Sequence, residues 1–277
     1  MTKLPHNRQF FFKFVFMKNE NPIGFFDSGI GGITIWKEFD KILPHENTIY
    51  LADSRNAPYG QKTPEEIIFL SEKNTEFLLN RNSKMVVVAC NTATTNAIDY
   101  LREKYKVPFI GIEPAIKPAA LNSKTGKIGV LATKGTLTSK LFHKAVKSYN
   151  NVEIIDQIGF GLVPLIEAGK IDSEEIKNLL KEYLSVMVQQ DIDYLVLGCT
   201  HYPFLTDLIK TMIPDHIQII DSGIPVAKHG KLLLERCGLV NSQKTTGIKE
   251  FYINADETVL KSLIANKKNY IIQQMDF

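Results

Sequence analysis

The stretches "MVVVAC" (85–90) and "YLVLGC" (194–199) each place a cysteine directly after an apolar run of strand length. Small and polar residues follow at once, as "NTATTN" after the first run and "THYP" after the second. Short, continuously apolar runs that end in polar residues are typical of strands buried on both faces of a parallel sheet. We therefore expect Cys90 and Cys199 at the carboxyl ends of two buried strands.

Further apolar runs of the same character lie before, between and after these two, at 23–27, 48–53, 108–112, 127–132, 152–156 and 217–221. They alternate with longer segments, such as 63–80 and 172–190, whose apolar residues recur at three and four positions. Thr63 and Asp172 are candidate N-caps of these helices, with Glu66 and Glu175 three residues later. Buried strands alternating with amphipathic helices predict an α/β fold of mostly parallel sheets flanked by helices.

The surroundings of the two cysteines resemble each other, which suggests two similar halves. Each thiol follows a strand and precedes a threonine within two residues, and the two lie 109 positions apart. A weaker repeat links "FFDSGI" (25–30) with "IIDSGI" (219–224). Ligands of open α/β sheets bind beyond the carboxyl ends of the strands. We therefore expect each half to present one thiol to a shared cleft.

The net charge of +3 gives no electrostatic reason to expect a nucleic-acid partner. Lys3, Arg8 and Lys13 account for the whole excess, and no acid lies among the first sixteen residues. The aromatic run "FFFKFVF" (10–16) is too short and too interrupted for a signal peptide or a membrane span. We interpret residues 1–20 as an extension outside the fold, with Met17 as an alternative start. Three scattered cysteines favour a reducing, cytoplasmic location.

A thiol at the start of a helix lies near the positive end of the helix dipole, which favours the thiolate. One ionised and one protonated thiol on opposite sides of a carbon could remove a proton from one face and deliver another to the other. One buried cysteine after an apolar strand is more often plain packing, but two in matching polar contexts favour chemistry. Cys237, in "LLLERCGLV", has only the packing context, and we interpret it as structural.

Other residues near these strand ends could bind a small anionic ligand. Asp27 and His201 carry charge beside the predicted cleft, although each alone is as readily a helix cap or a structural residue. Backbone N–H groups at helix starts would add donors, and the glycines of "SGIGG" (28–32) would allow close approach. No Cys/His spacing predicts a metal site, and "GIGG" fits no nucleotide-binding fingerprint. Neutral donors are available from Ser28, Tyr59, Gly60, Asn91, Thr92, Thr136, Thr138 and Thr200.

At these residues the chain resembles the glutamate racemase family. Five motifs occur in the family's order and spacing, and the Cys-Asn-Thr and Cys-Thr-His-Tyr-Pro pair is specific. The resemblance runs from about residue 23 to about residue 265, and the N-terminal extension is its main departure. The motifs are "GFFDSGIGGITIW" (24–36), "YLADSRNAPYG" (50–60), "VVVACNTATTNA" (86–97), "GVLATKGTLTS" (129–139) and "LVLGCTHYP" (195–203).

The resemblance implies an isomerase that interconverts L- and D-glutamate without pyridoxal phosphate, metal or nucleotide, in the bacterial cytoplasm, for peptidoglycan. It implies two α/β domains with the active site between them: 21–115 plus 227–270, and an inserted domain at 116–226. By analogy Cys90 acts on D-glutamate and Cys199 on L-glutamate. Asp27, His201 and Glu167 assist them. Substrate-binding positions carried over are Asp27, Ser28, Tyr59, Gly60, Asn91, Thr92, Thr200 and His201.

Three alternatives remain open from the residues alone. An aspartate racemase would use the same two-thiol chemistry on a shorter substrate. A non-catalytic amino-acid-binding protein would hold one enantiomer without exchanging its Cα hydrogen. A redox protein would join Cys90 and Cys199 reversibly, although the pair lacks a CxxC context. We also expect a homodimer, the commonest oligomer among soluble enzymes.

Overall fold

The computed structural model describes residues 18–149, 151–264 and 268–277, and its larger sheet contains six strands. The strand order is β10-β9-β2-β1-β3-β4, and every neighbouring pair is parallel. This confirms the predicted α/β class. The strands are β1 (Ile23–Asp27), β2 (Thr48–Ala52), β3 (Met85–Val88), β4 (Phe109–Gly111), β9 (Lys249–Ile253) and β10 (Tyr270–Gln274).

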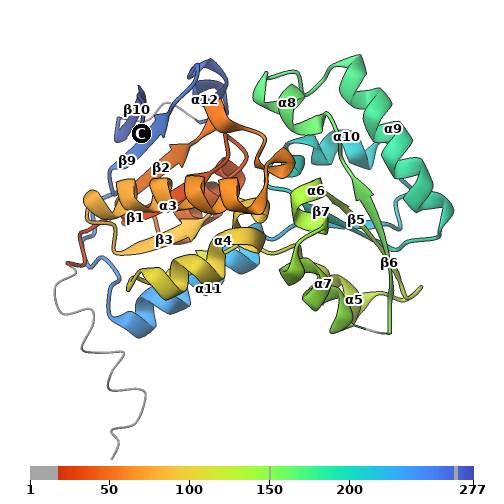
Figure 1. The fold of residues 1–277 in the computed structure, drawn as a ribbon, viewed down its shortest axis with the longest axis horizontal. Coiled ribbons are helices and arrows are strands. Elements are labelled where there is room, and N and C mark those ends of the chain that lie inside the picture. The colour runs from red at the N-terminus through yellow and green to blue at the C-terminus, as the bar shows by residue number, and fades with distance from the viewer. Residues whose placement is uncertain (1–17, 150, 265–267) are drawn as a thin grey trace, which may run out of the picture.

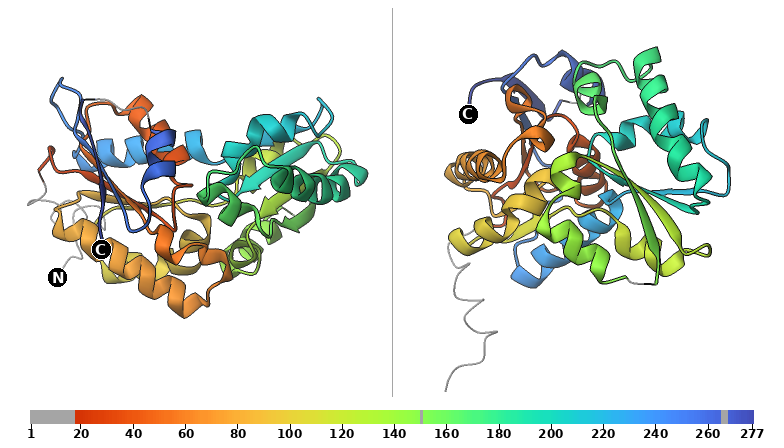
Figure 2. Two further views of the ribbon diagram at one scale, coloured as in Figure 1. Left: turned by 90° about the horizontal axis from the view of Figure 1, so that it is seen from above. Right: turned by 45° about the vertical axis from the view of Figure 1, so that its right-hand side comes forward.

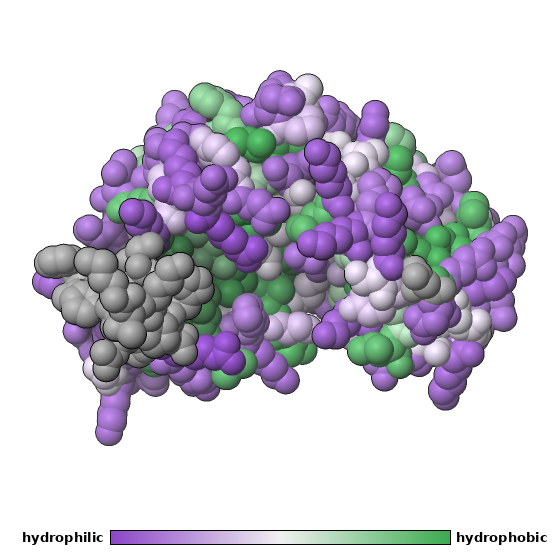
Figure 3. Space-filling model, turned by 60° about the horizontal axis from the view of Figure 1, so that its bottom comes forward, coloured by the Kyte–Doolittle hydropathy of each residue, from purple (hydrophilic) through white to green (hydrophobic). Residues whose placement is uncertain are grey.

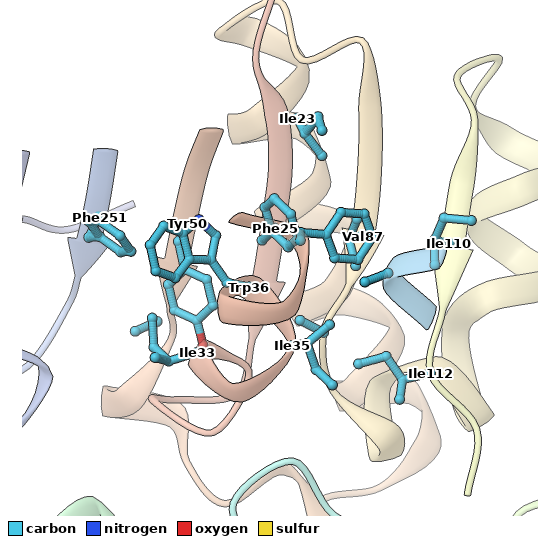
Figure 4. Packing of buried hydrophobic residues seen from close by; sticks show 14 of the residues in the cluster. Ile23, Phe25, Ile33, Ile35, Trp36, Tyr50, Val87, Ile110, Ile112 and Phe251 are labelled. Atoms are coloured by element: carbon cyan, nitrogen blue, oxygen red, sulfur yellow. The ribbon is translucent and has the colours of Figure 1, made fainter. Parts of the chain in front are cut away.

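Helices cover both faces of this sheet, as the continuously apolar strands require. One face packs against α2 (Ile33–Ile42), α11 (Gly223–Cys237) and α12 (Thr258–Leu263). The other packs against α3 (Pro64–Asn80) and α4 (Asn91–Lys104). Figure 4 shows aromatic and branched side chains filling the first face. In that core Trp36 meets Phe251 edge to face, with ring centroids 4.8 Å apart.

The second sheet has four strands in the order β6-β5-β7-β8, again all parallel. One face packs on α8, α9 and α10, and the other on α5, α6 and α7. The strands are β5 (Lys127–Ala132), β6 (Glu153–Ile158), β7 (Tyr194–Gly198) and β8 (Gln218–Ile220). The helices are α5 (Ile116–Asn122), α6 (Lys134–Leu137), α7 (Lys140–Lys147), α8 (Leu162–Glu167), α9 (Glu174–Gln189) and α10 (Thr206–Lys210).

Three short 3-10 turns follow two of the strand ends that point toward the candidate site, those of β2 and β7. They are η2 (Ser54–Asn56), η3 (Tyr59–Gln61) and η4 (Tyr202–Leu205). At the longer helices, Thr63 begins α3 with the predicted capping box, in which Thr63 and Glu66 each accept the other's backbone N–H. The predicted N-cap of α9 is wrong by one residue: Ser173, not Asp172, accepts the N–H of Ile176, at 3.3 Å.

The two sheets form two lobes joined by the chain after β4 and by the start of α11 (Figures 1 and 2). The chain thus leaves the first sheet, builds the second, and returns along α11 to complete the first. We keep the division into 21–115 plus 227–270, and 116–226, as a proposal. In the structure α11 begins at Gly223 and β10 ends at Gln274, so elements cross both of the later boundaries.

The predicted N-terminal extension falls mainly on residues 1–17, which lie outside the described residues. Its last residues are part of the folded body: the carbonyl of Glu20 accepts the amide of Asn47 at 2.7 Å, and the carbonyl of Asn19 accepts Lys84. Among the described helices, none has the length and hydrophobicity to cross a bilayer. Figure 3 shows hydrophilic residues over most of one face, with hydrophobic patches scattered between them.

Candidate active site

The candidate site is a small cavity where the carboxyl ends of strands from both sheets meet. About 240 Å³ of space between atoms lies within it, and part of this space is open to solvent. Cys90 follows β3 in the larger sheet, and Cys199 follows β7 in the smaller one. Its lining consists of Ser28, Pro58, Tyr59, Gly60, Cys90, Asn91, Thr92, Thr133, Val163, Cys199, Thr200 and His201. The two thiols therefore reach one cavity from opposite sheets.

Cys90 is buried and takes the N-cap position of α4, where its sulfur accepts the N–H of Ala93 at 3.4 Å. Its thiol donates to Ser28 Oγ at 3.7 Å, and Ser28 Oγ lies 3.3 Å from a carboxylate oxygen of Asp27. Burial raises the pKa of Cys90 well above its usual value, and the charge of Asp27 raises it further. The N–H of Ala93 at the start of α4 lowers this pKa, as expected for a helix N-terminus, but burial and the carboxylate of Asp27 outweigh it, so the net shift is upward.

Cys199 has a different neighbour. Its sulfur lies 3.7 Å from Nδ1 of His201, whose Nε2 lies 2.5 Å from Oε1 of Glu167. Burial would lower the pKa of His201, but its hydrogen bonds to Cys199 and Glu167 together raise it well above the usual value. These contacts therefore favour the imidazolium form of His201. The sulfur of Cys199 thus has this imidazole ring as its hydrogen-bond neighbour.

Glu167, at the end of α8, joins the two lobes. Its Oε1 accepts the N–H of Ile30 at 2.7 Å, and its Oε2 accepts the hydroxyl of Ser54 at 2.7 Å. Burial would raise the pKa of Glu167, but the hydrogen bonds from His201, Ser54 and Ile30 hold it below the usual value. The structure thus places Glu167 beside His201, as the family resemblance implied. Ser54 was not among the predicted site residues.

Asp27 ends β1 completely buried beneath the cavity. One carboxylate oxygen accepts the N–H of Ser28 at 2.7 Å, and the other accepts the N–H of Gly32 at 2.6 Å and Thr200 Oγ1 at 3.3 Å. Burial raises its pKa despite these donors and the nearby His201. Asp27 therefore organises the loop between β1 and α2 and sets the charge around Cys90.

The glycines of this loop lie directly against the charged pair of the other lobe. A Cβ on Gly29 would lie 2.0 Å from Glu167 Oε1, and one on Gly31 would lie 2.3 Å from His201 Nδ1. No side chain fits at either position without displacing Glu167 or His201. We expected the glycines of "SGIGG" to let the backbone approach a ligand. In the structure Gly29 and Gly31 instead let it approach Glu167 and His201.

The predicted threonines divide into two sets. Thr92 and Thr200 line the cavity, and Thr92 Oγ1 lies 2.8 Å from Thr133 Oγ1 and 3.3 Å from Thr136 Oγ1. Thr136 is buried behind this contact and does not line the cavity. Thr138 is exposed and bonds the carbonyl of Lys134, so it is not placed at the site. Thr133, which sequence reasoning missed, is the lining residue from this segment.

Tyr59 and Asn91 line the cavity, but part of each is engaged elsewhere. The Tyr59 hydroxyl donates to Asp53 at 2.5 Å, and the Asn91 amide lies 3.4 Å from the carbonyl of Ile112. Gly60 packs against the other lobe, where a Cβ would lie 2.8 Å from that of Thr133. Within the described part of the chain, no cluster of three or more His, Cys, Asp or Glu side chains could hold a metal ion.

Comparison with known proteins agrees with this geometry. The family model for Asp/Glu/Hydantoin racemases matches residues 34–229. The glutamate racemase of Herpetosiphon aurantiacus is 43% identical over 238 residues, which cover 86% of this chain and 94% of that protein. Two solved structures are similar throughout. The glutamate racemase of Bacillus anthracis has a TM-score of 0.83 and 29% identity, covering 93% of this chain and 98% of its own.

The second structure is the glutamate racemase of Francisella tularensis in complex with D-glutamate. It has a TM-score of 0.79 and 30% identity, covering 92% of this chain and 98% of its own. The chain belongs to the Asp/Glu/Hydantoin racemase family, and the predicted isomerase class, an amino-acid racemase, is confirmed. Within that family its similarity is to the glutamate racemases, as the motifs predicted.

Proposed function

We propose that this protein interconverts L- and D-glutamate by two-base proton transfer between Cys90 and Cys199. The observation that carries the proposal is that both buried thiols line one small cavity, each from a different sheet. The similarity to glutamate racemases over most of the chain supports glutamate as the substrate, as does the D-glutamate bound in the Francisella structure.

The two thiols differ in their surroundings, and this difference supports the different roles that we propose for them in the resting protein. Cys90 is held as a thiol by burial and by the carboxylate of Asp27. Cys199 lies beside the ring of His201, and we propose it as the base. The charge distribution therefore suits L-glutamate, with Cys199 as the base.

In the first step the Cys199 thiolate takes the Cα proton, so an S–H bond forms and the C–H electron pair stays on the substrate as a carbanion. In the second step the Cys90 S–H bond breaks and its proton is delivered to the opposite face of Cα, leaving Cys90 as a thiolate. The product is D-glutamate, and the two cysteines have exchanged protonation states. D-glutamate is converted by the reverse sequence.

The Cα proton of an amino acid is very weakly acidic, so the site must stabilise the developing negative charge. Thr92, Thr133 and Thr200 line the cavity and supply candidate hydroxyl donors, and the N-terminus of α4 adds its dipole. Preorganised donors in a cavity that excludes water contribute several kcal/mol each in other enzymes. Closure of the two lobes around glutamate would supply that exclusion.

Hydrogen exchange at Cα tests the two-base step. Starting in D₂O from either pure enantiomer, the early product should carry deuterium at Cα while the remaining substrate stays largely protiated. A single base serving both faces would return some original hydrogen to the product. Cys90→Ser and Cys199→Ser should each lose most racemisation, since a serine hydroxyl is too weak an acid and too poor a base near neutrality. Cys237→Ala is the matched control and should stay active.

Polarimetry separates the remaining alternatives. Rotation should decay when L-glutamate is incubated with the protein alone, and L-aspartate should be converted far more slowly. Faster conversion of aspartate would favour an aspartate racemase. Binding of one enantiomer without Cα exchange would favour an amino-acid-binding protein. Activity that tracked reversible joining of Cys90 and Cys199 would favour redox chemistry.

Supply of D-glutamate for peptidoglycan in the cytoplasm is the cellular role that we propose, with a homodimer as the assembly. Depletion of the protein in its host should cause lysis that added D-glutamate prevents. Continued growth without either would contradict this role. Light scattering on the purified chain would test the dimer.

A further inference from the structure

We infer that Ser54 is a positioning residue: its hydroxyl, together with the N–H of Ile30, fixes Glu167 across the lobe boundary so that His201 can support Cys199 as a base. The inference rests on the proposed function for its consequence in catalysis. Its structural part concerns only how groups of the larger-sheet lobe hold the carboxylate of the other lobe.

The observation is that each oxygen of Glu167 has a donor from the larger-sheet lobe. Ile30 N–H donates to Oε1 and Ser54 Oγ donates to Oε2, both at 2.7 Å. Ile30 follows β1 and Ser54 begins η2 after β2, whereas Glu167 ends α8 in the smaller-sheet lobe. The Glu167 side chain is only 14% exposed, so few waters can replace these donors.

The hydrogen bonds continue from Glu167 toward the thiol. Oε1 of Glu167 lies 2.5 Å from His201 Nε2, and Nδ1 of the same ring lies 3.7 Å from the Cys199 sulfur. The orientation of one carboxylate therefore sets the orientation and charge of the ring beside Cys199. If the lobes separate, Glu167 loses the hydrogen bonds from Ser54 and Ile30. Among the described residues, its carboxylate is then held only by His201.

The space around the pair makes this contact specific. Gly29 approaches Glu167 so closely that an added Cβ would lie 2.0 Å from Oε1, so the backbone of the larger-sheet lobe packs directly against the carboxylate. Ser54 is the one side-chain hydroxyl recorded on Glu167 among the described residues. The Ile30 N–H belongs to the backbone, so Ser54 is the donor that substitution can remove.

The charged groups that face His201 come from three elements. Glu167 lies on α8, Cys199 follows β7, and Asp27 ends β1, where its own pKa responds to His201. Removing the Ser54 hydroxyl changes only how Glu167 is held. A less ordered Glu167 stabilises the imidazolium less, so the pKa of His201 should fall. Activity that needs the imidazolium should then be lost at a lower pH than in the wild type.

The test compares Ser54→Ala and Ser54→Thr with the wild type, and with Ser185→Ala, whose exposed hydroxyl bonds only the carbonyl of Glu182. We expect Ser54→Ala to lower kcat/KM on the order of tenfold, because misplacement by about 1 Å costs up to about a hundredfold. The alkaline limb of its kcat/KM profile should move to lower pH. Ser54→Thr, which keeps the hydroxyl, should restore most activity, and Ser185→Ala should match the wild type.

A double-mutant cycle and a titration separate positioning from general damage to the fold. If Ser54 acts through Glu167, Ser54→Ala should add little to the loss already caused by Glu167→Gln. NMR titration of ring-labelled histidine, assigned with His201→Gln, should show a lower pKa for His201 in Ser54→Ala. This readout needs no turnover, so it tests the inference even if the wild type fails to racemise glutamate, which would overturn the proposed function instead. An unchanged His201 pKa, or losses that multiply in the double variant, would overturn the role of Ser54.

Discussion

The two thiols illustrate how a residue's chemistry depends on what the fold places beside it. Cys90 has a carboxylate and a serine hydroxyl within its hydrogen-bond chain, whereas Cys199 has an imidazole. Each cysteine follows an apolar strand and precedes a threonine within two residues, so their sequence contexts are similar, and both side chains are buried. The acid and base roles that we propose for them would arise from Asp27 on one side and from the His201–Glu167 pair on the other.

His201 should make the stability of the protein depend on pH in a predictable direction. Its folded-state pKa is raised well above the usual value of about 6.5. Charging His201 therefore contributes stability that is fully present below about pH 6.5 and is lost as the pH rises through the folded-state pKa. In urea unfolding, the advantage of wild type over His201→Gln should shrink as the pH rises above about 6.5. A difference that stayed constant with pH would contradict the raised pKa.

In the wild type, Glu167 contributes to stability in another pH range. Its folded-state pKa is lowered, so its contribution is present above its usual value near 4.5 and is lost only as the pH falls through the folded-state value. The raised pKa of Cys90 is present in both proteins and cancels in the comparison.

At the scale of elements, the contact of α11 with α2 closes the larger-sheet lobe after the chain returns from the smaller sheet. Glycine at position 230 allows the two helices to approach this closely. A Cβ there would lie 2.3 Å from the ring of Phe39. Phe39 is buried and packs edge to face on Phe25, with ring centroids 5.1 Å apart. The ring therefore has little room to yield.

Gly230→Ala should destabilise the protein even though alanine is the better helix former. Helix propensity favours alanine by about 1 kcal/mol, but overpacking of a core costs about 1–3 kcal/mol. We expect a net loss of about 1 kcal/mol in the free energy of unfolding, measured by urea denaturation. Lys231→Ala, at the exposed neighbouring position, should change stability little. A more stable Gly230→Ala variant would mean that α11 shifts freely on α2.

The sequence predicted the strands that carry the thiols, because a continuously apolar run followed by polar residues is a local signal. Strands β9 and β10 were not predicted. Lys249, at the start of β9, is fully buried and paired with Asp40 at 2.8 Å. A charged residue at this position interrupts the apolar pattern by which a buried strand is predicted from sequence. Strand β10 lies at the edge of the sheet and is partly exposed, which removes the apolar signal.

The site was predicted where motifs name its residues and was missed where long-range contacts define them. Ser54 gains its role from Glu167, a partner 113 positions away, and Thr133 from Thr92. Thr136 and Thr138 stand two positions apart around one helical turn, so they cannot share a direction. The pKa of Cys90 could not be predicted because the start of α4 is visible in sequence whereas the closeness of Asp27 is not.

At the scale of the whole molecule, it remains a prediction that the N-terminal segment does not contribute to the fold. Deleting residues 1–16, so that the chain starts at Met17, should leave racemisation and the melting temperature nearly unchanged. The reason is the segment's distinct composition, together with the recorded contacts of Asn19 and Glu20, which the deletion keeps. A clear loss in either measurement would show that the aromatic run packs on the folded body.

The unequal surroundings of Cys90 and Cys199 have a consequence set by the symmetry of the substrate. Mirror-image amino acids have equal free energies in water, so the proposed reaction has an equilibrium constant of one. Thermodynamics then makes kcat/KM identical in the two directions, however different the two thiols are. Asp27 and the His201–Glu167 pair can therefore make one direction turn over faster only by raising its KM in the same proportion. The site is asymmetric although kcat/KM is the same in both directions. In the kinetics this asymmetry is visible only when kcat and KM are measured separately for each enantiomer.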